Sequence, residues 1–149
     1  MTALKRNKVV GGRALLSALN ELVLISLPIA LYVTIEAFAK GDLKHLYASP
    51  EWSIATIFLA FQAPSLFQRC MAHAKRRPFE PTVGLVNMFS LVLIVSSSCL
   101  VYASIPEGGD VSMKWRLGLL AAAGTFFVAF VGAGKRVEML AEETDATTK

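Results

Sequence analysis

Residues 83–105 read VGLVNMFSLVLIVSSSCLVYASI, and this stretch contains no charged side chain. A helix needs about 20 predominantly apolar residues to cross the roughly 30 Å hydrocarbon core of a bilayer. The stretch therefore predicts a membrane-spanning helix, and the rest of the chain is best interpreted as part of a membrane protein.

Three further stretches have a similar length and apolar character, at residues 19–39, 51–69 and 115–134. The composition agrees, since 54% hydrophobic residues and a mean hydropathy of +0.53 are too apolar for an ordinary soluble fold. We predict an all-α integral membrane protein, a four-transmembrane-helix bundle that forms a single domain over residues 1–149. A short polar tail is expected at 144–149.

The start of the second span carries a recognisable signal, Ser49-Pro50-Glu51. A capping hydroxyl, a proline at the first helical position and an acid in the first turn all favour a helix start. We expect the Ser49 side chain to cap this helix.

Basic residues are distributed unevenly between the predicted loops. Eleven lie on one side of the membrane, and four lie on the other, at Lys40, Lys44, Lys114 and Arg116. Because cytoplasmic loops are enriched in Lys and Arg, both chain ends are expected in the cytoplasm. Small size and this bias suggest a multi-pass protein of the bacterial inner membrane.

One alternative concerns the beginning of the chain, where basic residues, an apolar run and Ala37-Phe38-Ala39 resemble a signal peptide. The apolar run is long for a signal peptide, and Glu36 lies next to the site. Retention of this first helix is the favoured interpretation.

Glu21 is the main ionisable residue inside a predicted span, where it follows Asn20 about one turn from the inner end. A charge at the bilayer centre costs at least ~2.5 kcal/mol on insertion scales. One interpretation is that Asn20 and Glu21 cap the helix start, where the positive end of the helix dipole favours an acid. The other is a buried carboxylate that binds a cation or proton, or pairs with a base such as Arg69.

Polar side chains also interrupt the second and third spans, at Gln62, Ser65, Gln68 and Asn87. Within the second span, Pro64 removes one backbone hydrogen bond and frees the carbonyl of Ala60. A polar stripe facing lipid is costly. We therefore expect these groups to face other helices, a subunit contact or a water-filled path.

The fourth span carries a ridge of small residues spaced four apart, at Ala121, Thr125, Ala129 and Ala133. Small side chains allow helix backbones to approach closely in a bilayer. The ridge predicts close helix packing, within one chain or between chains, and we expect a homo-oligomer.

Basic residues gather where two spans end on the predicted cytoplasmic side, at Arg69, Arg76, Arg77, Lys135 and Arg136. Such a face attracts anionic membrane lipids and can also receive a cytoplasmic protein partner. No basic region is interleaved with aromatic residues, so direct binding of nucleic acid is not expected.

Motifs of catalysis and metal binding are absent from the sequence, including Gly-rich phosphate loops, HExxH and nucleophile elbows. Cys70 and Cys99 belong to no CxxC motif. The sequence therefore predicts a protein that is not an enzyme and uses no cofactor or metal.

Two functions remain open at this point. The first is a non-enzymatic membrane subunit that homo-oligomerises and acts as a sensor, anchor or gated pore. The second follows from a resemblance, because four helices, a short chain and Glu21 in the first helix are loosely similar to the small multidrug resistance transporters. That resemblance covers the helix count and one glutamate, and it implies a small proton- or cation-coupled transporter that uses Glu21.

Overall fold

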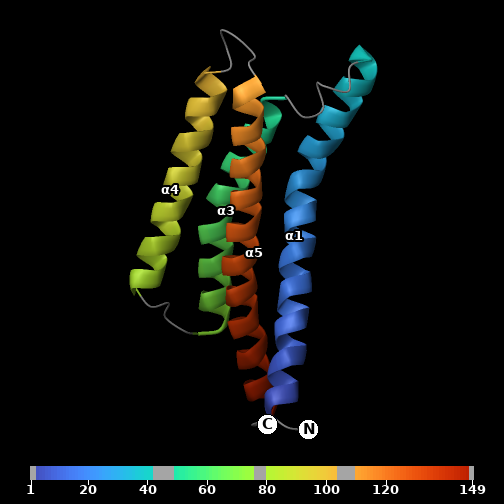
Figure 1. Cartoon of the computed structure of the whole chain (residues 1–149). Helices are drawn as coiled ribbons and strands as arrows, with labels where there is room; N and C mark the ends of the chain where they lie inside the picture. The colour runs from blue at the N-terminus through green and yellow to red at the C-terminus, as the bar shows by residue number, and fades with distance from the viewer. Residues whose placement is uncertain (1–2, 42–48, 76–79, 104–109, 148–149) are drawn as a thin grey trace.

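The computed structural model is all-helical and contains four long helices. It describes residues 3–41, 49–75, 80–103 and 110–147, with side chains described for 9–41, 49–75, 81–102 and 114–144. The helices are α1 (Ala3–Lys40), α3 (Glu51–His73), α4 (Glu80–Ala103) and α5 (Asp110–Thr147). Successive helices alternate in direction, so the start of α1 and the end of α5 lie at the same end of the bundle (Figure 1).

Three of these helices are long and apolar enough to cross a membrane, over Val9–Lys40, Pro81–Tyr102 and Lys114–Thr144. The prediction of an all-helical membrane protein is confirmed at this level. The remaining helix, α3, is more polar because it contains Gln62, Ser65 and Gln68. α3 packs against all three other helices and buries its small and apolar face in protein, while Gln62 and Ser65 stay half-buried and Gln68 is exposed.

The core lies where α3 and α5 pack together, with contributions from α1 and α4. Phe127 and Val131 of α5 are fully buried against Leu59 of α3, and small residues complete the cluster. The small members are Ala18, Ala60, Ala63 and Ala123. Because large and small side chains interdigitate, the interior of the bundle is filled by side chains.

Glycines of α5 mark its closest approaches to other helices. A Cβ atom on Gly132 would lie 3.8 Å from Ala18 of α1, and one on Gly134 would lie 3.1 Å from the Cβ of Cys70 in α3. Aromatic rings add further contacts, because Phe130 meets Phe67 edge to face with 6.2 Å between centroids. These contacts fix how α5 is rotated in the bundle.

α1 and α5 are longer than their predicted spans, and they continue together past the end of α3 and the start of α4 (Figure 1). Before its predicted span, α1 presents Val10, Ala14 and Ala18, which are buried at a spacing of four residues. α5 remains helical through Thr147, so it includes residues 144–147 of the segment expected as a polar tail.

Two expectations about helix starts need correction. α1 passes through Asn20 and Glu21 without a break, so these residues do not cap a helix. At the start of α3, Ser49 makes no side-chain capping bond to the backbone, and its hydroxyl instead donates to the carboxylate of Glu51. A carboxylate is a strong hydrogen-bond acceptor, so the Ser49 hydroxyl donates to Glu51, and its oxygen does not accept from the backbone N–H groups that a cap would satisfy.

Candidate functional site

A polar groove of about 330 Å³ lies between α3 and α4. Its polar lining consists of Ser65 and Gln68 from α3, with Asn87 and Ser90 from α4. The two helices run antiparallel, which brings the inner part of α3 alongside the first turns of α4. Three of the four polar residues were singled out from the sequence for their position in the spans, and the structure brings them to one place.

Hydrogen bonding in the groove is incomplete. Ser90 is only 5% exposed, and its hydroxyl has no hydrogen-bond partner among the described residues. The side chains of Ser65, Gln68 and Asn87 likewise make no hydrogen bond within the described part of the chain. Pro64 also lines the groove and has no N–H to donate to the Ala60 carbonyl, which lies one turn earlier on the same wall.

Two further buried hydroxyls of these helices, Ser53 of α3 and Ser97 of α4, also have no partner among the described residues. Several hydroxyls elsewhere in the bundle instead donate to carbonyls of their own helix. Ser98 donates to Ile94 at 2.8 Å, Thr56 to Trp52 at 2.9 Å and Thr34 to Ala30 at 2.7 Å. Back-bonding of this kind is the usual way a membrane helix satisfies a hydroxyl. The groove is therefore a place where several polar side chains without a hydrogen-bond partner in the described residues lie together.

An ion pair joins α1 to α5 near the inner end of the bundle, between the carboxylate of Glu21 and the ammonium of Lys135. Both side chains are mostly buried, at 27% and 17% exposed. The second carboxylate oxygen of Glu21 is buried without a hydrogen-bond partner among the described residues. Glu21 thus pairs with a base, and that base is Lys135 of α5 instead of Arg69 of α3.

A second contact between polar side chains joins α3 to α5, one turn further along α5. The Nδ1 atom of His73 lies 3.8 Å from a carboxylate oxygen of Glu138 and 2.9 Å from the carbonyl oxygen of Arg69. Since Lys135 and Glu138 are one turn apart on α5, the two contacts form a band of charge where the apolar part of the bundle ends. Both depend on how three helices are aligned.

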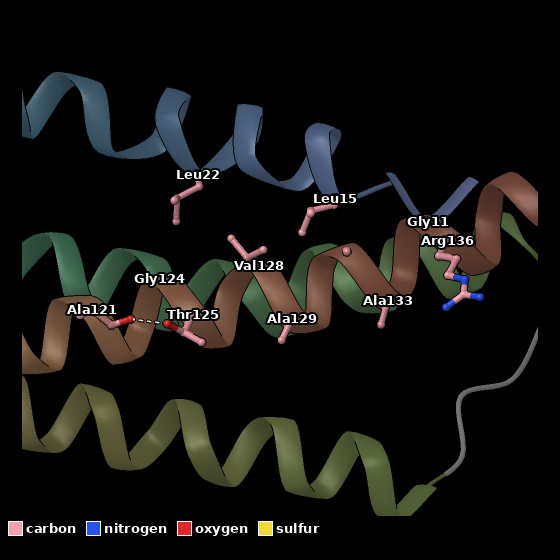
Figure 2. Close-up of a pocket in the computed structure, with 11 residues that line it drawn as sticks. Gly11, Leu15, Leu22, Ala121, Gly124, Thr125, Val128, Ala129, Ala133 and Arg136 are labelled. Carbon is pink, nitrogen blue, oxygen red and sulfur yellow. Dashed lines mark hydrogen bonds between the residues drawn. The ribbon is translucent and has the colours of Figure 1, made fainter. Parts of the chain in front are cut away.

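The small-residue ridge of α5 faces outward. Ala121, Thr125, Ala129 and Ala133 are exposed, and they line an open groove of about 690 Å³ between α5 and α1 (Figure 2). Leu15 and Leu22 form the α1 side, and Arg136 lies at the inner end of the groove. Thr125 donates its hydroxyl to the Ala121 carbonyl at 2.8 Å, so the ridge itself has no unsatisfied side chain.

The remaining residues of interest are spread over the surface. Asn20 is exposed on the outer side of α1, Arg69 is exposed on α3, and Gln62 is half-buried outside the polar groove. Arg76 and Arg77 lie outside the described residues. Within the described residues, no group of three or more His, Cys, Asp or Glu side chains is arranged to hold a metal ion.

Sequence reasoning missed Ser90 as a site residue and missed the pairing of Glu21 with Lys135. The sequence does not single out Ser90, because whether its hydroxyl finds a partner depends on which side chains lie beside it in the fold. The ion pair has a weak sequence signal, since Glu21 and Lys135 each lie at the inner edge of an apolar run.

Comparison of the chain with protein-family models, with curated proteins and with solved structures finds no match.

Proposed function

We propose that this chain is a non-enzymatic subunit of a bacterial inner membrane that assembles with copies of itself and acts as a sensor, anchor or gated pore. All four helices cross the membrane, both chain ends lie in the cytoplasm, and the basic inner face receives a protein partner. Support comes from the fold, the outward ridge of α5 and the charges at the inner end.

The proposal that α3 also crosses the membrane is supported by its neighbours. A helix surrounded by other helices meets less lipid, so it needs fewer apolar residues than a helix at the edge. α3 contacts α1, α4 and α5, and it buries Leu59, Ala63 and Phe67 against them. The antiparallel order of α1, α3, α4 and α5 then returns the chain to the side on which it began (Figure 1).

One observation supports self-assembly, namely the outward position of the small-residue ridge of α5. The intrachain core of α5 uses Ala123, Phe127 and Val131, while the ridge of Ala121, Thr125, Ala129 and Ala133 stays exposed. Exposed small residues on a membrane helix allow another helix to approach closely. Close approach increases the van der Waals packing that stabilises helix association in lipid. A second copy supplies such a helix.

Side chains fill the interior of the four-helix bundle, and this limits where a pore could run. The centre of the bundle is occupied by Phe127, Leu59 and Val131, each no more than 2% exposed. A conducting path therefore runs between copies if the assembly is a pore, which makes self-association a requirement for that activity.

The inner face supports the role of a partner. Arg69, Lys75 and Arg136 are exposed at the end of the bundle where α1 and α5 extend past the other helices. Such a surface attracts acidic protein segments or anionic lipid. Replacement of Arg69 and Arg136 by Gln is expected to weaken partner capture while insertion and mass stay unchanged.

The decisive experiment is the molar mass of the detergent-solubilised protein, measured across a range of protein concentrations. Wild type is expected to exceed the monomer mass, and Ala129→Leu is expected to reduce that mass by blocking close approach at the ridge. Ala39→Leu is the matched control, because Ala39 is an exposed alanine of α1 outside the groove. A monomeric wild type at every concentration, with no crosslinked species in membranes, contradicts the proposal.

A small proton- or cation-coupled transporter is the second candidate, and one observation favours it. Glu21 places one carboxylate oxygen against Lys135 and leaves the other buried and unpartnered among the described residues. Competition between a cation and Lys135 for this carboxylate would provide the coupling step of such a transporter. Ion flux into liposomes that is present in wild type and lost in Glu21→Gln supports this candidate over the first.

A further inference from the structure

The polar groove between α3 and α4 contains a combination that is unfavourable in contact with hydrocarbon. Ser90 is only 5% exposed, and it lines the groove with a hydroxyl that has no partner among the described residues. Gln68 and Asn87 are exposed amides on the same walls. Each amide carries two donors and one acceptor group that water or protein satisfies and lipid tails do not.

The groove carries no formal charge, and this limits what fits it. Amides and hydroxyls both donate and accept, so such a surface is complementary to another copy of itself. In a two-fold dimer whose axis runs along the membrane normal, residues at one depth face the same residues of the second copy. Asn87 then meets Asn87 of the second copy without the repulsion that a charged side chain would introduce.

Apolar side chains surround the polar groups in the way that an interface requires. Phe61 and Leu91 line the groove and are 69% and 64% exposed, and Met88, which follows Asn87 in α4, is 72% exposed. α4 also lies at the edge of the bundle, away from α1, so it is accessible to a neighbour (Figure 1). A rim of large apolar residues around a polar centre provides van der Waals packing and removes the hydrogen bonds from lipid.

We propose that a second copy of this chain docks on the α3/α4 groove, with the exposed amides of Gln68 and Asn87 forming interhelical hydrogen bonds across a two-fold axis. This inference rests on the proposed self-assembly and names the surface that carries it. The ridge of α5 belongs to a different surface, so the two contacts are separable by mutation.

The test is the dimer dissociation constant in liposomes, measured by energy transfer between labelled copies as the protein-to-lipid ratio is varied. The variant Gln68→Met/Asn87→Leu keeps side-chain size and removes the amides. An interhelical hydrogen bond in a membrane is worth on average about threefold in association, so loss of two or more is expected to weaken dimerisation by about tenfold. Ser98→Ala is the matched control, because Ser98 is an exposed α4 hydroxyl that is already bonded to Ile94.

A second measurement keeps the test independent of stability. In a background of Cys70→Ala/Cys99→Ala, a cysteine replacing Met88 is expected to form disulfide-linked dimers in membranes, and one replacing Leu24 on α1 is not. Helix content by circular dichroism confirms folding of each variant.

The outcomes separate the two proposals. If wild type self-associates and the double amide variant does so equally well, with no Met88→Cys dimer, the α3/α4 interface is wrong and self-assembly stands. A wild type that remains monomeric overturns both. Weaker association of the amide variant with unchanged Ser98→Ala supports the interface, and weakening by Ala129→Leu alone assigns assembly to the α5 ridge.

Discussion

Gly134→Ala is expected to destabilise the protein because α5 approaches α3 closely at this glycine. A Cβ atom added there would lie 3.1 Å from the Cβ of Cys70, 3.3 Å from Cδ2 of Phe67 and 3.5 Å from the Phe67 Cα. Two of these neighbours are held by the α3 backbone, so they cannot turn aside as the end of a flexible side chain would. The helices must move apart locally.

The magnitude follows from two opposed effects. Alanine is about 1 kcal/mol more favourable than glycine in a helix interior. Overpacking of a well-filled contact costs about 1–3 kcal/mol. Gly118→Ala provides the reference, because a Cβ atom there meets nothing within 4 Å. The propensity gain is common to both variants, so Gly134→Ala is expected to be less stable than Gly118→Ala by about 1–3 kcal/mol.

The assay is reversible unfolding in mixed micelles, followed by circular dichroism at 222 nm as the fraction of denaturing detergent is raised. Both variants and wild type are measured under one condition. Equal stability of the two glycine variants, or a more stable Gly134→Ala, would falsify the close packing of α5 on α3. In a Cys70→Gly background, which removes the opposing Cβ atom, the Gly134→Ala substitution is expected to cost less than it does in wild type.

Three further predictions concern other parts of the bundle. Glu21→Gln and Lys135→Met are each expected to lower the free energy of unfolding by about 1.5–3 kcal/mol, because each leaves a mostly buried charge unpaired. The double variant is expected to lose less than the sum of the two single losses, and additive losses contradict the ion pair. Phe127→Ala removes a fully buried ring and is expected to lower the free energy of unfolding by about 3–5 kcal/mol. Phe38 is 74% exposed, so Phe38→Ala is expected to change it by less than about 0.5 kcal/mol. Similar losses for the two variants contradict the assignment of Phe127 to the core. A cysteine that replaces Thr147 is expected to react with a membrane-impermeant maleimide in inverted or permeabilised membranes and not in intact cells. Labelling in intact cells refutes a topology of four spans with both chain ends in the cytoplasm.

The apolar spans of α1, α4 and α5 were predictable because hydrophobic length alone determines whether a helix can cross a bilayer. α3 was harder, since its Gln62, Ser65 and Gln68 lower its hydropathy. The central position of α3 among three other helices is a property of the tertiary structure, and its own sequence does not show it.

The site was predictable in its residue types and less so in its geometry. Ser65, Gln68 and Asn87 stood out as polar groups in apolar runs, and they do share one groove. The pairing of Glu21 with Lys135 depends on the axial alignment of α1 with α5, which neither segment encodes alone. The outward position of Ala129 depends on how α5 is rotated, and Phe127 and Gly134 set that rotation through contacts with α3.

The shared position of the start of α1 and the end of α5 makes the chain suited to genetic concatenation (Figure 1). A flexible Gly/Ser linker between the end of one copy and the start of the next need not cross the membrane if all four helices do, and its reach grows with the square root of its length. Concatemers of two, three or four copies then give a direct count of subunits. A single Asn87→Leu copy placed at a chosen position in such a concatemer would also reveal how many interfaces each function requires.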